Sequence, residues 1–349
     1  MKTSWRLLKV GVVRIGAFLL AGQFPGQDHA AVLERTVAAA VAAEDAGFDD
    51  VWIAEHHFMS YGVCPSAITC AAYVLGCTTR IEVGTAVSVL STVHPVALGE
   101  QAALLDQLSG GRFRLGVGRG GPWVDLEVFG TGQSRIEGGF NASLDLLLRW
   151  LTGERVAADD GPFRFREVAV VPRPATRPRP PILLACTSDS SAQLAAQRAL
   201  PMLLGMNVPD EDKAAMVARY AEASQAAGCD PGAAGHVGAM LAQVAESREE
   251  ATAQLRESMP GWLGPGLAGF RPLGGEPRRY ADPVAYADLL CSIGAVGSPE
   301  QCAARLSDAR GRTGIDHMIL MVDACGEREL TMANIARLGA QVLPRLRGM

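Results

Sequence analysis

The chain has 349 residues, 48% of them hydrophobic, which is enough for one large domain with a well-buried core. Its 32 Lys and Arg residues against 37 Asp and Glu residues give a net charge of −5, spread without long blocks, so composition excludes the charge pattern of a nucleic-acid or membrane-surface binder. The first apolar run, Val10–Leu20, is interrupted by Arg14, is too short to span a bilayer and precedes no cleavage pattern. We therefore expect a cytoplasmic protein that acts on small molecules or other proteins.

The cysteines are scattered without a CxxC pair, which favours a reducing compartment over a disulfide framework. We expect them to behave as small buried hydrophobic residues. The eight are Cys64, Cys70, Cys77, Cys186, Cys229, Cys291, Cys302 and Cys325.

Short β-rich apolar runs alternate with longer segments of helical period, a pattern typical of βαβ units in a parallel sheet. Met1–Val12 carries no recognisable element and is an N-terminal extension to a single domain over residues 13–349. The predicted strands are Val13–Leu20, Asp50–Ala54, Ile81–Ala86, Arg112–Val117, Ile182–Cys186, Met202–Gly205, Val237–Ala245 and His317–Val322. The predicted helices are Ala31–Ala46, which Gly47 ends, and Pro95–Leu108, Gly138–Leu151, Ser190–Arg198, Asp210–Ala227, Pro299–Ala309 and Glu327–Leu346. Eight such repeats predict an α/β fold, a single (β/α)8 TIM barrel with inserted loops, whose active site lies at the carboxyl ends of the strands.

Two segments interrupt the alternation. Ala157–Pro180 contains prolines and short strand-like runs. Met259–Tyr280 is rich in Gly, Pro and Arg and lacks apolar periodicity, so we expect residues 259–280 to be either a disordered linker or a mobile lid over the site.

The most informative motif is Trp52–Phe58, where a buried strand ends and at once presents Glu55, His56 and His57. Titratable side chains at the carboxyl end of a barrel strand face the catalytic mouth. A zinc site is the rival interpretation, but adjacent residues at a strand end point in opposite directions and no HxH or HExxH spacing accompanies them. We predict catalytic residues and no metal.

The glycine-rich run Gly116–Gly121 follows a predicted strand and formally matches the dinucleotide pattern GxGxxG. A dinucleotide fold needs a helix that begins within the loop, whereas Pro122 and Trp123–Gly132 offer no helical run. We interpret the glycines as a close backbone approach to a planar or anionic ligand, with Arg119 as a phosphate-binding fork.

A third strand end, Cys186–Ser191, forms a hydroxyl-rich turn before the helix Ala192–Arg198. Backbone N–H groups and hydroxyls at a helix N-terminus can bind an anion. Ordinary N-capping by Ser188 or Ser190 explains the same residues without a ligand. Because all three clusters fall at strand ends, they favour a mouth that binds a phosphorylated, planar cofactor.

These residues resemble the α subunit of bacterial luciferase, a member of the luciferase-like flavin-dependent monooxygenases. Gly47–Phe58 is similar to that subunit's second strand, and the likeness is dense over Gly47–Arg135 and thin after Met206. Further similar runs are Ala71–Gly76, Val83–Ala86, His94–Val96, Leu104–Ser109, Gly111–Arg114, Val128–Thr131, Leu200–Met202 and Val296–Glu300.

The resemblance implies an enzyme that uses O2 and reduced FMN, supplied by a separate NAD(P)H:flavin reductase, to hydroxylate or epoxidise a small organic substrate. It places the flavin ring against a cis peptide at Ala86-Val87. The residues that it implies for the FMN phosphate are Arg119, Arg135, Thr187, Ser188 and Ser191, although the family usually has a glutamate where this chain has Thr187.

The family's catalytic base corresponds to His56, which we expect Glu55 to orient, with His57 and Asp125 shaping the pocket. Gly118 stands where the luciferase carries a reactive cysteine, and we expect this change to widen the space beside the ring.

Two other functions stay open: a deazaflavin-dependent oxidoreductase of the same superfamily, and a non-catalytic flavin-binding subunit. The Ala-, Gly- and Arg-rich composition is associated with high-GC genomes, where relatives often modify secondary metabolites such as polyketides in antibiotic biosynthesis. Relatives also commonly dimerise through the helices beside the second and third strands, which implies a homodimer.

Overall fold

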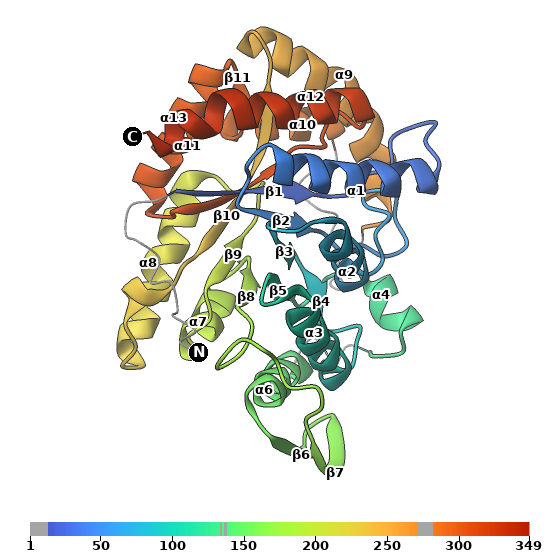
Figure 1. Cartoon of the computed structure of the whole chain (residues 1–349), viewed down its shortest axis with the longest axis vertical. Coiled ribbons are helices and arrows are strands. Elements are labelled where there is room, and N and C mark those ends of the chain that lie inside the picture. Colours follow the sequence, from blue (N-terminus) through green and yellow to red (C-terminus); the bar gives the residue numbers. More distant parts are fainter. Residues whose placement is uncertain (1–12, 133–134, 136–137, 271–281, 349) are drawn as a thin grey trace.

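Eight parallel strands form a closed ring at the centre of the molecule (Figure 1). The computed structural model describes residues 13–132, 135, 138–270 and 282–348. The ring consists of β1 (Arg14–Leu19), β2 (Asp50–Ile53), β3 (Glu82–Thr85), β5 (Phe113–Gly118), β8 (Ile182–Cys186), β9 (Met202–Leu204), β10 (Val237–Val244) and β12 (His317–Met321). Each of them overlaps a strand predicted from the sequence, and the TIM barrel is confirmed.

Closure of the ring is visible in the strand pairing. β1 pairs in parallel with β2 on one side, Gly16 opposite Asp50, and with β12 on the other, Arg14 opposite His317. The remaining neighbours follow in the order β2, β3, β5, β8, β9, β10 and β12. All eight residues of β10 and all five of β12 are buried, because one face of each strand fills the barrel and the other packs under helices.

The outer layer is built from helices between the strands (Figure 1). Its members are α1 (His29–Asp45), α2 (Ala67–Cys77), α3 (Pro95–Ser109), α4 (Trp123–Val128), α6 (Gly139–Thr152), α7 (Asp189–Gln197), α8 (Asp210–Ala226), α9 (Arg248–Ala268), α10 (Pro283–Ile293), α11 (Pro299–Thr313), α12 (Arg328–Arg337) and α13 (Leu343–Arg347), with a π-helical turn at Leu338–Val342. The seven predicted helices are all present. Gly47 follows α1 with a φ of 81°, the left-handed geometry expected of a glycine that ends a helix.

The prediction for Met259–Tyr280 is wrong over its first part. Met259–Ala268 is the last stretch of α9, not an irregular loop, although Pro260 and Pro265 lie inside the helix. Its buried side chains include Leu255, Met259, Trp262 and Leu263, which recur at helical spacing. Residues 271–280 of the predicted lid, like the extension Met1–Val12, lie outside the described residues.

The other interrupting segment, Ala157–Pro180, overlaps an antiparallel hairpin of β6 (Arg155–Asp160) and β7 (Phe163–Ala169). Figure 1 shows it projecting from the ring beside α6. Trp150 of α6 and Phe163 of β7 belong to a small separate core that holds the hairpin in place. Two short strands lie beside the ring: β4 (Ser88–Val89) pairs with β5, and β11 (Ala295–Gly297) pairs with β10.

A buried charge cluster fills the end of the barrel opposite the strand carboxyl ends. Asp50 is fully buried, and its Oδ1 accepts a hydrogen bond from Trp52 Nε1 at 2.6 Å. Its Oδ2 accepts a hydrogen bond from Arg14 Nη2 at 2.7 Å and lies 2.9 Å from His317 Nε2. Burial alone raises the pKa of Asp50, but His317 and Arg14 outweigh it and hold the pKa well below its usual range.

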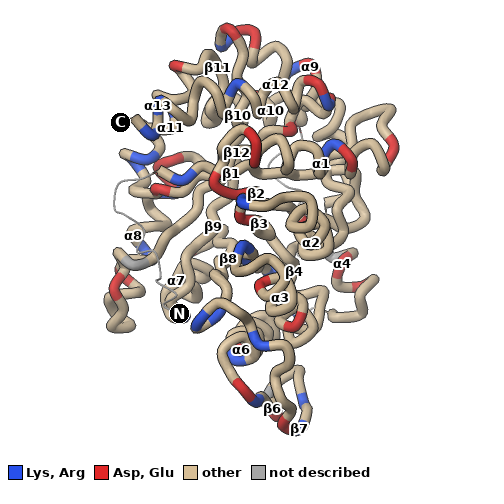
Figure 2. Tube along the Cα trace, viewed as in Figure 1, with Lys and Arg blue, Asp and Glu red and all other residues tan. Residues whose placement is uncertain are grey.

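Elsewhere Lys, Arg, Asp and Glu are interspersed over the outer helices (Figure 2). None of the helices in the described part of the chain is long and apolar enough to cross a membrane.

Candidate active site

The predicted site residues follow four strands that are consecutive neighbours in the ring. Glu55–His57 follows β2, Ala86–Val87 follows β3, Arg119 follows β5, and Thr187–Ser191 follows β8. Parallel strands present their carboxyl ends at the same rim of a barrel. The fold therefore brings segments from residue 55 to residue 191 to one arc of the mouth.

Glu55, His57 and Asp125 form a buried titratable cluster in this arc. The side chains of His57 and Asp125 are buried, and Glu55 Oε1 lies 3.4 Å from His57 Nε2. Burial raises the pKa of Asp125, and the nearby Glu55 carboxylate adds to this effect while His57 opposes it. Asp125 is thus a buried carboxyl group whose pKa is raised and which lies close to Glu55 and His57.

The carboxylate of Glu55 is bound by backbone groups of two other segments. Its Oε1 accepts a hydrogen bond from the backbone N–H of Val89 at 2.9 Å, and its Oε2 accepts one from that of Ala67, also at 2.9 Å. Together with the contact to His57, these bonds occupy both carboxylate oxygens. Glu55 and His57 lie two positions apart, so their side chains point to the same side of the strand end and come within 3.4 Å of each other.

The His56 ring contacts a column of three aromatic residues, of which one, Trp262, belongs to α9. Its ring meets Tyr61 edge-on at 4.9 Å, and Tyr61 stacks on Trp262 at 5.0 Å with the ring planes nearly parallel. Trp262 Nε1 donates to the carbonyl of Tyr61 at 3.1 Å, and Phe24 also stacks on Trp262, with the ring centroids 5.3 Å apart. The sequence reasoning missed Tyr61 and Trp262, since it interpreted the segment that contains Trp262 as irregular.

The Ala86-Val87 peptide bond is cis, as the resemblance implied. A Cβ added to Gly118 would lie 2.5 Å from Val87 Cγ2, closer than real Cβ contacts allow. The expectation that Gly118 leaves a wider space beside the ring is therefore wrong, because the Val87 side chain occupies that space. With Val87 in this position, a side chain at residue 118 would clash with it, and only a glycine fits there.

The glycine-rich loop places Arg119 at the surface, where its side chain is exposed, and Ser91 Oγ donates to its backbone carbonyl. A Cβ on Gly120 would lie 2.6 Å from Val89 Cγ1, so the close approach inferred for these glycines is to a neighbouring strand. We expected no helix after Pro122, and this expectation is wrong: α4 begins at Trp123, with Pro122 at the N-cap position. With only six residues, α4 is much shorter than the helix of a dinucleotide-binding unit.

The serine-rich turn is a capping box. Ser188 is the N-cap of α7 and accepts from the Ser191 backbone N–H at 3.4 Å, while Ser191 Oγ accepts from the Ser188 N–H at 3.0 Å. Ser191 Oγ also accepts from the Thr187 N–H at 3.1 Å. Asp189, in the first turn, is paired with Arg219. The capping interpretation therefore accounts for Ser188 and Ser191 in this structure.

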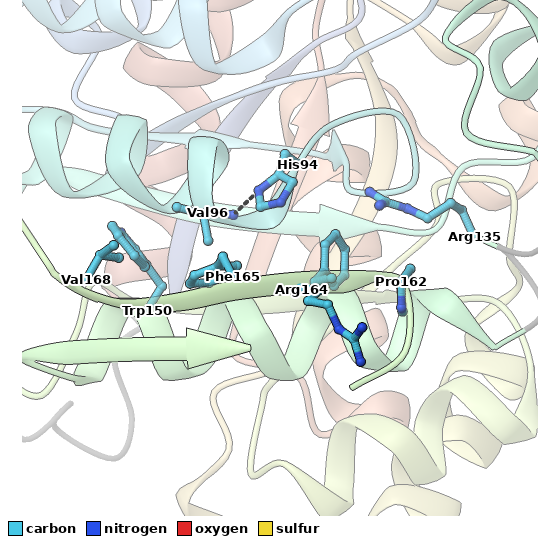
Figure 3. Close-up of a pocket in the computed structure, with 9 residues that line it drawn as sticks. His94, Val96, Arg135, Trp150, Pro162, Arg164, Phe165 and Val168 are labelled. Carbon is cyan, nitrogen blue, oxygen red and sulfur yellow. Dashed lines mark hydrogen bonds between the residues drawn. The ribbon is translucent and has the colours of Figure 1, made fainter. Parts of the chain in front are cut away.

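Arg135 lies apart from this turn, in a pocket beside the hairpin (Figure 3). Its guanidinium donates to the carbonyl of Val93 at 2.6 Å and lies over the Phe163 ring at 4.8 Å, with His94 edge-on to the same ring. The pocket has a volume of about 540 Å³ and is lined by His94, Val96, Arg135, Trp150, Pro162, Phe163, Arg164, Phe165 and Val168. In this conformation Arg135 is held by the β4–α3 connection and the hairpin.

Two aromatic residues that the sequence reasoning did not single out cover His57. Phe129 meets the His57 ring edge-on at 4.9 Å, and Phe58 and Phe129 lie 5.7 Å apart. Both are exposed, Phe58 to 56% and Phe129 to 42%. Exposed aromatic rings beside buried titratable groups are typical of a binding surface. Over the described residues there is no group of three or more His, Cys, Asp or Glu side chains that could hold a metal ion.

Comparison with known proteins places the chain in a family. The family model described as luciferase-like monooxygenase matches residues 13–317. The chain belongs to the luciferase-like monooxygenase family. The alkanal monooxygenase alpha chain of Photorhabdus luminescens is 30% identical over 352 aligned positions, which cover 96% of this chain and 98% of that protein.

Solved structures of several other proteins share the barrel fold. The monooxygenase RslO1 from Streptomyces bottropensis is similar with a TM-score of 0.81 at 24% identity, over 95% of this chain and 99% of that one. The oxygenating constituent of 3,6-diketocamphane monooxygenase from Pseudomonas putida, in complex with FMN, has a TM-score of 0.77 at 17% identity, over 95% and 98% of the two chains. An F420-dependent secondary alcohol dehydrogenase has a TM-score of 0.76 at 17% identity, over 96% and 99%. The fold is thus common to FMN and F420 proteins.

Proposed function

We propose that this luciferase-like monooxygenase binds reduced FMN at the barrel mouth and uses O2 to oxidise a small organic substrate. The observation that carries the proposal is the arc of four neighbouring strand ends, which holds His56, the cis Ala86-Val87 peptide, Arg119 and the Thr187–Ser191 turn. We further propose that an NAD(P)H:flavin reductase supplies the reduced flavin, and that the substrate is a secondary metabolite such as a polyketide.

The residues present suit a flavin phosphate and ring. Arg119 offers an exposed cation, and the first turn of α7 offers backbone N–H groups and hydroxyls, a favourable set for an anion. Asp189 would repel that anion, but Arg219 neutralises it. Arg119, Thr187, Ser188 and Ser191 would hold the phosphate, with Arg135 joining if it left Val93. Ala86, Val87 and Gly118 would lie against the ring.

Buried polar atoms at the mouth also fit a polar ligand. Within the described residues, Ser88 Oγ and Asp125 Oδ1 are buried without a hydrogen-bond partner. A buried polar atom without a hydrogen bond destabilises the folded protein unless a ligand or a water molecule supplies the missing bond. Ser88 directly follows the cis peptide, so the unsatisfied hydroxyl lies next to the place proposed for the flavin ring.

Bound reduced FMN would supply two electrons to O2, and the protein's own groups would manage protons and water. His56 would accept or donate a proton at its imidazole, positioned by Tyr61 rather than by Glu55. Asp125, whose pKa is raised by burial, would line the pocket beside His57. Phe58 and Phe129 would keep water from His57.

Aerobic turnover tests the proposal directly. The purified chain is incubated with FMN, NADH, a generic flavin reductase and a panel of candidate substrates, and products are examined by mass spectrometry. A gain of one oxygen in a product supports the proposal. Tight binding of F420 with no binding of FMN would instead identify a deazaflavin enzyme, and flavin binding without any turnover would identify a non-catalytic subunit.

His56→Ala tests the assignment of the base. We expect FMN affinity to stay nearly unchanged and turnover to fall by about 100-fold or more, as for loss of a general acid–base group. His29→Ala is the matched control, because His29 is an exposed residue at the start of α1 and should leave both quantities unchanged. Full turnover in the His56 variant would remove that assignment.

A further inference from the structure

The pocket beside the hairpin is separate from the arc of strand ends that forms the candidate active site (Figure 3). Its walls come from the start of α3, from α6 and from the hairpin, and of its lining residues only Arg135 is also assigned to the flavin. The volume of about 540 Å³ lies within the range of roughly 300–1,000 Å³ that is typical of small-molecule sites. No step of the proposed reaction uses this pocket.

Aromatic and apolar side chains form much of the lining. Phe163 is buried, and Phe165 and Val96 are partly buried against the same small core. The Arg135 guanidinium lies 4.8 Å above the centre of the Phe163 ring, and His94 meets that ring edge-on at 5.0 Å. Aromatic rings favour stacked or edge-on contacts with other rings, so this lining suits a flat aromatic ligand.

The polar side chains of the pocket offer hydrogen-bond donors. Trp150 is buried, and its Nε1 has no acceptor among the described residues. Arg135 Nε also lacks a partner there, while Nη2 of the same guanidinium donates to the Val93 carbonyl and so holds Arg135 beside the pocket. His94 Nδ1 accepts the N–H of Val96 at 3.2 Å, so the neutral ring carries its proton on Nε2. A ligand that completes these donors must carry acceptor atoms.

The lining carries positive charge. Its nine residues include Arg135, Arg164 and His94, and no Asp or Glu. Arg164 is paired with Asp159 at 2.7 Å, so the charge left for a ligand is that of Arg135. Burial lowers the pKa of Arg135, and burial together with the Arg135 charge lowers the pKa of His94. An anion beside these two side chains would replace the hydration that the partly buried cation has lost.

We propose that this hairpin pocket is a second ligand site, which binds a small aromatic carboxylate. The carboxylate accepts hydrogen bonds from Arg135 and His94, and the aromatic ring lies against Phe165. Figure 3 shows Arg135 and Trp150 toward opposite ends of the row of lining side chains, so the ring extends from the charged end of the pocket toward Trp150. This binding is independent of the proposed function, since it needs neither flavin nor turnover.

Calorimetric titration of the full chain with 2-naphthoate, in the absence of flavin, tests the proposal. We expect a dissociation constant of about 1 mM or lower, as for a good small ligand. Arg135→Gln should weaken binding by at least about 10-fold, because a charge-assisted hydrogen bond is lost. His94→Asn keeps an N-cap for α3 but lacks the ring donor, and should weaken binding several-fold. Arg166→Gln, an exposed arginine of β7 outside the lining, should bind as the wild type does.

NMR of the indole N–H groups locates the bound ligand. The chain has five tryptophans, and the indole signal that is missing from Trp150→Phe belongs to Trp150. We expect 2-naphthoate to shift this signal, because its ring reaches the end of the pocket that Trp150 lines. A shift of the Trp262 signal alone would place the ligand next to His56 and Tyr61 and would overturn the proposal.

Two further ligands and one further variant separate the outcomes. Equally tight binding of inorganic phosphate, which has no ring, or of the neutral naphthalenemethanol, which has no charge, would contradict the proposal. Loss of 2-naphthoate binding in Arg119→Gln would place the ligand at the barrel mouth and would also contradict it. Variants that unfold at the wild-type temperature by circular dichroism show that the lost side chain, not a lost fold, weakened binding. Binding in a chain without monooxygenase activity would reject the proposed function and leave this inference standing.

Discussion

His236 gives the molecule a pH-dependent stability at the scale of one residue. It is buried ahead of β10, its Nδ1 accepts the backbone N–H of Met202 at 3.1 Å, and its ring meets Tyr220 edge-on. Burial lowers the pKa of His236 to about 4, because the charged imidazolium loses its hydration. The unfolded chain binds this proton near the ordinary pKa of about 6.5.

Because the folded pKa lies below the unfolded one, the stability from neutral His236 is fully present above about pH 6.5 and is lost as the pH falls toward 4. The loss amounts to roughly 3 kcal/mol at most. We expect His236→Asn, whose amide oxygen can still accept the Met202 N–H, to flatten the free energy of unfolding over this range. Urea titrations at several pH values measure it, with His29→Asn as the exposed control; equal slopes in all three proteins would contradict the assignment.

Residue identity predicted that the candidate residues would gather at one rim of the barrel, because titratable and glycine residues at strand ends are visible in a sequence. The contacts that these residues make with distant segments of the chain are not visible in the sequence. Nothing near Glu55 in the sequence indicates that Val89 and Ala67 occupy its oxygens. Nor does Gly118 reveal that Val87 fills the space beside it, since that contact arises only when β4 and β5 pair.

At the scale of elements, α9 connects the outer layer to His56, and two of its glycines allow a controlled test. A Cβ on Gly266 would lie 3.0 Å from Tyr61 Cα, whereas one on Gly264 would meet only Pro283 Cγ at 3.8 Å. We expect Gly266→Ala to displace Tyr61 and lower turnover several-fold. Gly264→Ala should keep full turnover and gain up to about 1 kcal/mol of stability from helix propensity. Turnover and thermal unfolding of both variants measure these effects.

Equal turnover in the two alanine variants would show that the Tyr61 contact does not position His56. A fall in both would point to a general disturbance of α9. The comparison is sharp because the two glycines lie in the same helix, only two residues apart.

The strands were easier to predict than the helices. Each barrel strand is a short apolar run between polar segments, because both of its faces are covered. In α9, by contrast, Pro260, Pro265 and several glycines conceal a helix whose apolar spacing begins before Met259. Packing of Trp262 and Leu263 against the barrel outweighs the unfavourable propensities, a tertiary effect that local patterns do not contain.

At the scale of the whole molecule, α2 and α3 pack side by side and leave apolar side chains in solvent. Leu108 is 76% exposed, Leu104 is 47% exposed on the same face of α3, and Tyr73 of α2 is 65% exposed. We expect a homodimer that buries this surface, since exposed apolar patches mark association sites. Leu104→Lys with Leu108→Lys should yield monomers in sedimentation experiments. Val284→Lys, an exposed apolar position on α10, should stay dimeric; a dimer that survives the double change would contradict this surface.

The pairing of β1 with β12 has a consequence for synthesis. On the ribosome, β1 and β2 emerge early, but the outer edge of β1 has no partner until His317–Met321 has left the exit tunnel. The nascent chain therefore carries an open sheet with an unpaired edge for most of its translation, the kind of intermediate that aggregates and that chaperones bind.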